Sequence, residues 1–260
     1  MKGLNRQEGS LFIDNVSLHE LEPRINPEVL GGSLMNDVSS VEAYRYVLAL
    51  LQASEKMGAS QVHGQVVGIR RNGSRPSAVI LDNGEISCNT VVIAMGPWSG
   101  IASSWLDFPV PVEPVKGQIL RLQFDESPLA SPMNHLDTYA GSKASDGLVW
   151  CGTTFERVGF DEKTTADARS SLLTRAIRLV PALENARLVL QTACLRPFSS
   201  DELPIIGEVP GWEGVYLATG AGAEGILLSP FLGQSIANLI LREKAEWDLS
   251  PFLPDRFANT

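Results

Sequence analysis

Cysteine is scarce in this sequence of 260 residues, which contains three: Cys88, Cys151 and Cys194. An odd number of widely separated cysteines forms neither a disulfide framework nor the paired ligands of a structural zinc site. Such usage is typical of a reducing compartment. We therefore predict a protein of the cytoplasm or of an organelle interior, with cysteines that are structural thiols.

Histidine is equally rare, and His19, His63 and His135 stand in polar surroundings without metal-ligand spacing. No Ser-His-Asp or Cys-His arrangement is indicated, so nucleophilic hydrolysis is not expected. The 30 Asp and Glu residues are scattered, and no carboxylate pair can be singled out for glycoside hydrolysis. The sequence therefore predicts no metal site and no catalytic triad.

Basic residues are outnumbered, since 21 Lys and Arg face 30 Asp and Glu and give a formal net charge of −9. Nucleic acids and anionic membranes require clustered positive charge, so neither is expected as a partner. The first residues lack the apolar core of a signal peptide, and no later run is judged to approach the length of a membrane span. We predict no signal and no membrane span.

What the sequence does contain is an ordinary globular composition, 44% hydrophobic and 20% charged, in a chain long enough to bury a core.

Residues 18–30 predict a turn or short helix before a strand near 32–35. A capping box at Ser39–Glu42 predicts a helix that Gly58 ends. Two Asn-Gly pairs between β-branched runs over 65–87 predict an antiparallel meander.

A continuous apolar strand is expected at residues 90–94. Its apolar residues do not alternate with polar ones as they do in a half-exposed strand. Such a continuous run is typical of a parallel sheet covered on both faces. The strand ends in Gly96-Pro97-Trp98, at the carboxyl end where open α/β sheets bind their ligands. A plain proline turn with a tryptophan in the core explains these residues equally well.

The middle of the chain has a different character. An alternating pattern with several prolines over 109–124 and a further strand over 147–153 predict a second sheet. Extended segments after residue 185 then lead back toward the C-terminal region, so two interleaved domains are favoured over two in series. A helix from about Thr165 to Val180 is expected to pack one apolar side, made of Leu172, Leu173, Ala176 and Leu179.

The glycine-rich stretch at 214–240 is the most informative. A strand at Val215–Ala218 breaks into Gly220, Gly222 and Gly225 and then into an apolar helix. The GxGxxG spacing matches a dinucleotide-binding loop, but neither a second strand nor an acidic residue follows about twenty positions later. We interpret it as a late cofactor-contacting loop, because exposed N–H groups at a helix start attract electron-rich atoms. A tight turn without a ligand is the alternative.

Arg196 follows a small, apolar run and precedes Pro197. A guanidinium in such surroundings needs a partner that offsets its desolvation. A substrate carboxylate held through two parallel hydrogen bonds is one candidate. An internal ion pair with Asp201 or Glu202 is the other, and the residues alone do not choose between them.

Five segments carry, in their order and spacing, a resemblance to a known family: TVVIAMGPWSG, PVKGQIL, GLVWCGTTFE, CLRPFSSDELPIIGEVP and GVYLATGAGAEGILLSPFLGQSIANLI. From about Leu18 to Ile240 the chain resembles the FAD-dependent D-amino-acid oxidase superfamily, and within it glycine oxidases and sarcosine oxidase-like proteins. The resemblance implies an α/β (α+β) fold. The C-terminal part of a Rossmann-like FAD-binding domain, 36–104 and 197–245, would be interleaved with an antiparallel-sheet substrate domain, 1–35 and 105–196.

The resemblance also implies an activity, oxidation of the C–N bond of a small amino acid or amine by hydride transfer to FAD. No side-chain base is required for it, so no catalytic residue is assigned. Substrate binding is implied for Arg196, which would hold the carboxylate, and for Tyr139 and Phe155. Contact with FAD is implied for one valine and two turns: Val66, Ala94, Met95, Gly96, Trp98, Gly220, Gly222, Ala223, Glu224, Gly225, Ile226 and Leu227.

Two departures from the family pattern matter. Ala221 and Ala223 stand where relatives often carry His or Arg, which leaves the tuning of the flavin and the exact substrate open. Family chains begin with a strand, a GxGxxG and a helix that bind the ADP part of FAD, and about the first hundred residues are expected to be missing here. A non-catalytic remnant or isoform and an FAD-linked dehydrogenase with another acceptor than oxygen stay open, as does assembly into a homo-oligomer.

Overall fold

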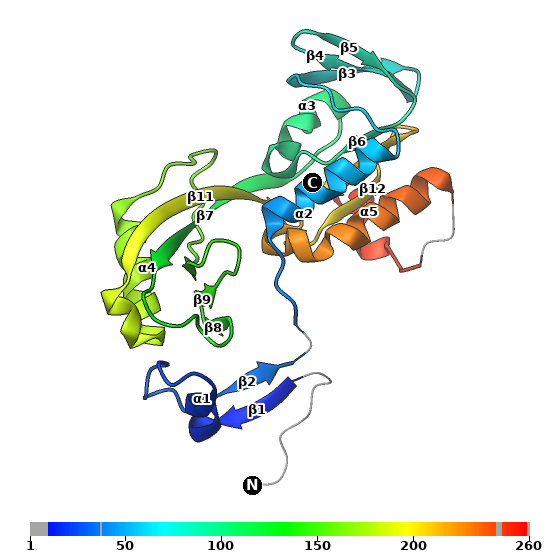
Figure 1. Ribbon diagram of the computed structural model, residues 1–260. Coiled ribbons are helices and arrows are strands. Elements are labelled where there is room, and N and C mark those ends of the chain that lie inside the picture. Colours follow the sequence, from blue (N-terminus) through cyan, green and yellow to red (C-terminus); the bar gives the residue numbers. More distant parts are fainter. Residues whose placement is uncertain (1–9, 37, 243–245, 259–260) are drawn as a thin grey trace. The chain divides into compact units, whose positions relative to one another are not determined.

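The computed structural model describes residues 10–36, 38–242 and 246–258. The chain divides into two compact units (Figure 1). Unit 1 comprises residues 1–50, 117–156 and 162–194, and unit 2 comprises 51–116, 157–161 and 195–260. The expected mixed α/β fold with interleaved parts is confirmed. Residues 1–9 of the expected substrate domain, and 37 and 243–245 of the expected FAD-binding part, lie outside the described residues.

Unit 1 is built on a sheet with the strand order β11-β7-β10-β9-β8. The strands β8, β9, β10 and β7 pair antiparallel, as the alternating patterns predict. The unit also holds the two-stranded sheet β1-β2 with the short helix α1 between its strands. The bounds are β1 Ser10–Asp14, α1 Asn15–Leu21, β2 Gly31–Met35, β7 Val112–Gln123, β8 Met133–His135, β9 Thr138–Ser142, β10 Val149–Gly152, α4 Ala166–Leu179 and β11 Arg187–Ser199.

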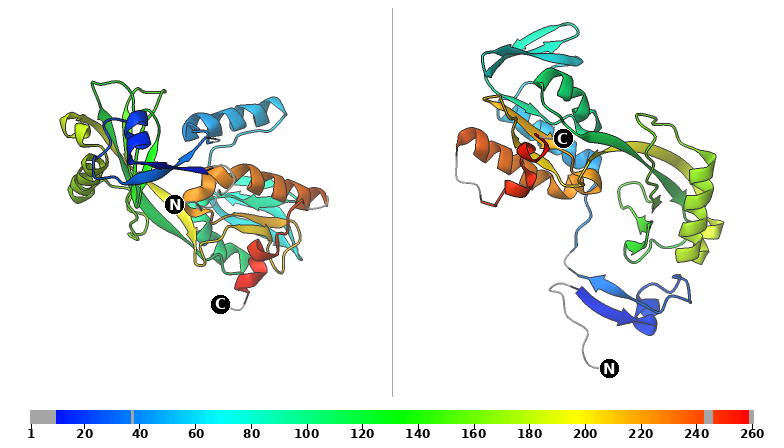
Figure 2. Two further views of the ribbon diagram at one scale, coloured as in Figure 1. Left: turned by 90° about the horizontal axis from the view of Figure 1, so that it is seen from below. Right: turned by 180° about the vertical axis from the view of Figure 1, so that it is seen from behind.

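One face of this sheet is closed by α4, which lies along β9 and β10 (Figure 2). Leu172 and Ala176 of the helix pack with Leu120 and Cys151 of the sheet in a buried core. The helix prediction is confirmed to within one residue at each end. The helix begins after Thr165 because the Thr165 hydroxyl acts as the N-cap and accepts a hydrogen bond from the N–H of Ala168.

Unit 2 contains two three-stranded sheets, β3-β4-β5 and β12-β13-β6. The first is the predicted antiparallel meander, which is confirmed. The helix α5 lies along β12 and β13 (Figure 2). The bounds are β3 Val66–Asn72, β4 Arg75–Leu81, β5 Gly84–Ser87, β6 Val91–Ile93, η1 Gly96–Ala102, α3 Ser103–Leu106, β12 Ile205–Glu208, β13 Val215–Thr219, η3 Gly222–Glu224 and α5 Gly225–Leu241.

The strand β6 pairs in parallel with β13, whose residues lie more than a hundred positions later in the chain. Its Ile93 packs in a core with Leu217 and Trp212. The parallel pairing that the apolar pattern predicts is confirmed. The expectation that both faces are covered is wrong for Val92, which is 40% exposed in the described structure.

The helix α2 spans Ala43–Lys56. The predicted capping box at Ser39–Glu42 is wrong, because the helix begins after it and the N–H of Tyr46 donates to the carbonyl of Glu42. The Ser-x-x-Glu spacing alone does not fix the cap, since a Ser side chain can bond to backbone groups in several local conformations.

Among the described residues, one helix qualifies as a membrane span by length and composition alone. It runs from Gly222 to Leu241 and joins η3 to α5. The expectation that no run approaches that length is therefore wrong for this segment. A single such helix is weak evidence for a membrane, because helices that pack inside globular proteins have the same composition.

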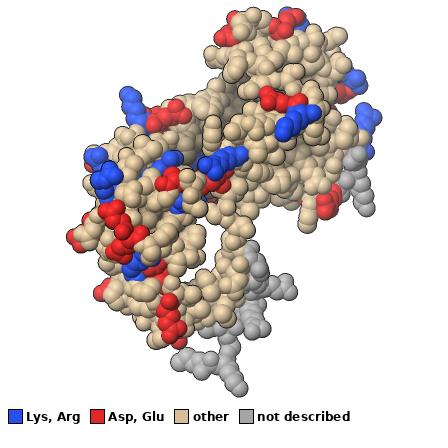
Figure 3. Space-filling model, viewed as in Figure 1, with Lys and Arg blue, Asp and Glu red and all other residues tan. Residues whose placement is uncertain are grey.

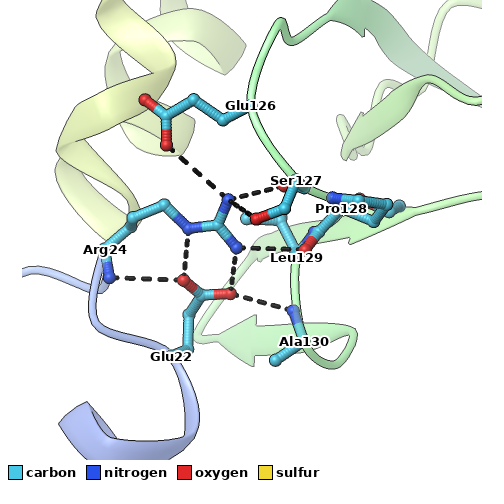
Figure 4. Close-up of polar contacts among 8 residues, drawn as sticks. Glu22, Arg24, Glu126, Ser127, Pro128, Leu129 and Ala130 are labelled. Carbon is cyan, nitrogen blue, oxygen red and sulfur yellow. Dashed lines mark hydrogen bonds and ion pairs between the residues drawn. The ribbon is translucent and has the colours of Figure 1, made fainter.

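A buried ion pair fixes the loop after α1 to the loop after β7 within unit 1 (Figure 4). Arg24 donates through Nε and Nη2 to the carboxylate of Glu22, at 2.5 and 2.7 Å. The N–H of Ala130 donates to the same carboxylate, and Arg24 donates onward to the carbonyl of Ser127 at 2.6 Å. Burial alone would raise the pKa of Glu22, but the hydrogen bonds from Arg24 and Ala130 outweigh it and hold that pKa below its ordinary value of 4.5.

Glu22→Gln is expected to destabilise unit 1 by about 1–3 kcal/mol at neutral pH, because it removes the nearer of the two carboxylates that pair with the Arg24 guanidinium, Glu22 and Glu126. A carboxyl with a lowered folded-state pKa stabilises above its unfolded pKa, and this contribution is lost as pH falls through the folded value. The deficit of the variant should therefore shrink below pH 4.5. Urea unfolding from neutral to acid pH measures this, with the exposed Glu20→Gln as control, and an equal deficit at all pH values contradicts it.

Candidate functional site

Two turns meet at the carboxyl ends of the parallel strands β6 and β13 in unit 2. The hydroxyl of Thr219 at the end of β13 lies 2.7 Å from the Ser99 hydroxyl and 3.3 Å from the carbonyl oxygen of Gly96, both in η1. Thr219 and Ser99 are 3% and 0% exposed. The structure thus brings together the strand-end turn at 94–98 and the glycine turn at 220–227, which the sequence predicts as parts of one site.

The glycine turn needs its glycines for different reasons. Gly220 and Gly222 adopt left-handed backbone, with φ of +76° and +53°. A Cβ on Gly222 would lie 3.1 Å from the Phe198 ring, so the turn is packed against β11. Gly225 is helical and has open space around it, since a Cβ there would meet only the Ala221 side chain, at 4.0 Å. Packing therefore explains the first two glycines, and the third leaves a surface clear.

The helix Gly222–Leu241, which η3 opens and α5 continues, begins at the glycine turn with N–H groups that no side chain caps. The start of η1 is likewise uncapped, and a Cβ on Gly96 would meet nothing within 4 Å. Uncapped donors beside a surface cleared of side chains suit an anionic or electron-rich planar group. The residues present therefore fit the flavin part of FAD, for which Ile226 and Leu227, 38% and 73% exposed, add apolar surface.

Arg196 lies near the end of β11, in the part of this strand from residue 195 onward that belongs to unit 2, and it is half-buried. Phe198, two residues later and so on the same side of the strand, forms a bridge with Ala221 of the glycine turn. The acidic residue Asp201 pairs with Arg256, at 2.7 Å. The predicted arginine therefore stands beside the predicted cofactor turn, and one of its two expected internal partners is bound to another arginine.

The other predicted substrate residues lie in unit 1. Tyr139 is on β9, opposite Gly152 of β10 in the ladder, and is half-buried. Phe155 follows β10 by three residues and is 54% exposed. Val66 begins β3 in unit 2, in a different sheet from the two turns. The structure thus joins the two turns and Arg196 within one unit, and Tyr139 and Phe155 within the other.

Trp98 is exposed, at 46%, so it is not the core tryptophan of a plain proline turn. Its ring stacks on Phe160 with the centroids 6.1 Å apart. Phe160 belongs to the segment 157–161 of unit 2. Ion pairs of Lys116 with Asp161, at 2.9 Å, and of Arg157 with Glu113 hold this segment to the rest of unit 2. Sequence reasoning missed these contacts. The one available signal was a basic residue, Lys116, next to the apolar Val115, and the Lys116 side chain is 1% exposed.

Other chemistry receives no support from the described residues. Among them no group of three His, Cys, Asp or Glu gathers around a common point. Burial raises the pKa of the Cys151 thiol to about 12, which leaves it protonated and unreactive. A pocket of about 330 Å³ beside β4 and β5 contains none of the predicted site residues. Basic and acidic side chains are interspersed on the face seen in Figure 3.

Known proteins are similar to this chain over most of its length. The sequence model of the family described as FAD dependent oxidoreductase matches residues 3–239. A glycine oxidase of Pseudomonas putida is 32% identical over 245 residues, which cover 94% of this chain and 67% of that protein. The hydrogen cyanide synthase subunit HcnC of Pseudomonas aeruginosa is 34% identical over 249 residues, covering 95% and 60%.

Among solved structures, the glycine oxidase of Geobacillus kaustophilus superposes with a TM-score of 0.89 at 29% identity. The match covers 95% of this chain and 67% of that one. The chain therefore spans between 60% and 67% of the length of these relatives.

Proposed function

We propose, because this chain belongs to the family of FAD-dependent oxidoreductases, that it oxidises the C–N bond of a small amino acid or amine with FAD as its cofactor. The observation that carries the proposal is the meeting of two glycine-bearing, uncapped turns beside Arg196 within unit 2. Unit 2 would hold the flavin. Tyr139 and Phe155, which belong to unit 1, are proposed as further substrate-binding residues.

When bound, FAD supplies the acceptor for a hydride from the carbon next to nitrogen, which leaves an imine and releases a proton. The guanidinium of Arg196 is proposed to hold the substrate carboxylate through two parallel hydrogen bonds. Tyr139 would donate a further hydrogen bond, and Phe155 would exclude water. The backbone N–H groups of the two turns would orient the electron-rich edge of the ring, and no side chain needs to act as a base.

The name of the Pseudomonas putida relative suggests glycine as the first substrate to try. We propose a small amino acid or amine as the substrate partner. We also propose a reducing compartment, since the three cysteines form no disulfide. Oxygen is the proposed final acceptor. A dehydrogenase that uses another acceptor is the second form of the same proposal, and peroxide release separates the two.

The test is a flavin spectrum of the purified protein, produced both as the 260-residue chain and with any in-frame coding sequence upstream of it. The proposal expects bound FAD whose visible absorption bleaches without oxygen on addition of glycine, sarcosine or D-alanine. Admission of air should restore the colour with release of peroxide. A protein that binds no FAD in either form, or a flavin that none of these amines bleaches, contradicts the proposal and favours a non-catalytic role.

A further inference from the structure

The sheet of unit 1 has a second face, opposite the one that α4 covers. Residues that pair across a ladder project to the same face, so Arg121, Trp150 and Gly141 form one row across β7, β10 and β9. Ile119, Gly152 and Tyr139 form the next row on that face. The face that carries the proposed substrate residue Tyr139 therefore also carries the cation of Arg121.

Two cations gather around aromatic rings on this face. The Arg121 guanidinium lies 4.1 Å from the centroid of the Trp150 ring. The ammonium group of Lys143 lies 5.7 Å from the Trp150 ring and 5.8 Å from the Tyr139 ring. These rings attract the cations through their faces and restrict where they lie. We call Arg121, Lys143, Trp150 and Tyr139 the cation cluster.

Tyr139 belongs to this cluster through its hydroxyl as well as its ring. A Cβ on Gly141 would lie 2.6 Å from that hydroxyl, so the phenol leans along β9 over Gly141. Gly141 is the residue directly opposite Trp150. The hydroxyl proposed to assist the substrate carboxylate thus lies in the row of Arg121 and Trp150.

The charges of the cluster are not balanced by the described residues. Asp146 accepts the indole N–H of Trp150 at 2.9 Å and lies 4.0 Å from Arg121 Nη1. Lys143 donates to the neutral hydroxyl of Ser40, at 2.8 Å, and no carboxylate among the described residues lies within ion-pair distance of it. The Nε of Arg121 is buried and has no hydrogen-bond partner in the described structure. In a chain of net charge −9, two cations therefore face one carboxylate here.

We propose that the cation cluster binds a second anionic group of the substrate, so that the preferred substrate is an amino acid or amine with two carboxylates. The inference rests on the proposed function, since Tyr139 is the link between cluster and substrate. Lys143 supplies the charge that has no carboxylate partner, and Arg121 supplies a second cation. Both are specificity-determining residues, and neither takes part in the chemistry.

Lys143→Met tests this proposal, since it keeps the length of the side chain and removes its charge. We expect the ratio of kcat/KM for iminodiacetate or D-aspartate to that for glycine to fall about tenfold, the scale of one half-exposed charge contact. Values for glycine should stay within about twofold. Lys56→Met, at the exposed end of α2, is the matched control and should change neither. An unchanged ratio in Lys143→Met overturns the proposal.

A binding measurement keeps this proposal separate from the proposed function. The indole N–H of Trp150 gives an NMR signal that Trp150→Phe identifies, and iminodiacetate is titrated against it in the full chain. We expect a saturable shift that Lys143→Met abolishes and that glycine does not produce. Absence of the shift overturns the cluster as an anion site even if glycine is oxidised. A flavin that no amine reduces overturns the proposed function, whatever the titration shows.

Discussion

Replacing Arg196 with methionine is expected to lower kcat/KM for a small amino acid by about 10²–10³-fold, because a bidentate, charge-assisted contact with the substrate carboxylate is lost. Bound FAD should remain at the level of the unchanged protein, since Arg196 is proposed to touch the substrate and not the cofactor. Steady-state oxidation of glycine, with the flavin content measured on the same samples, gives both values.

Arg187→Met is the matched control for this prediction. Arg187 is exposed at the start of the same strand, β11, so its replacement removes an equal charge at a place away from the site. It should leave kcat/KM unchanged. An amine without a carboxylate should also be oxidised equally by the Arg196 variant and the unchanged protein. If the Arg196 variant oxidises glycine normally, the assignment of its guanidinium to the substrate is wrong.

Replacing Gly225 with leucine is expected to weaken FAD binding by about 10²-fold or more, because the new side chain enters the space that the glycine leaves clear at the start of α5. The isolated fold should not suffer. Gly225 is helical, so a side chain there raises helix stability by about 0.5–1 kcal/mol relative to glycine. Loss of cofactor with gain of stability is an outcome that a merely structural glycine does not produce.

Gly233→Leu is the control for this effect, because Gly233 lies in the same helix and has nothing within 4 Å of its Cβ position. It should stabilise the protein similarly and leave FAD affinity unchanged. Fluorescence titration with FAD and thermal unfolding of the cofactor-free protein measure the two quantities. Unchanged FAD affinity in the Gly225 variant removes the glycine turn from the cofactor site.

Local patterns predicted the elements whose signals lie within a few residues of one another. The helix α4 follows from its apolar period and the Thr165 cap, and the meander follows from its Asn-Gly turns. The capping box at Ser39–Glu42 failed although its letters are right, because polar side chains near a helix start satisfy the backbone in more than one way.

Contacts between distant segments could not be predicted from periodicity. The hydrogen bond from Thr219 to Ser99 spans 120 positions and depends on the parallel pairing of β6 with β13. The pair of Lys116 with Asp161 and the hydrogen bond from the Ala130 N–H to Glu22 need surroundings that only the folded chain supplies. The resemblance to a family located the candidate site, and the residues alone left Arg196 with two possible partners.

A crystal structure of the protein with FAD and acetate tests the central claim most directly. The account predicts that the flavin ring lies against residues 222–227 and that Arg196 donates two hydrogen bonds to the acetate. A flavin bound elsewhere, or an Arg196 guanidinium that faces solvent while acetate binds at another place, contradicts it.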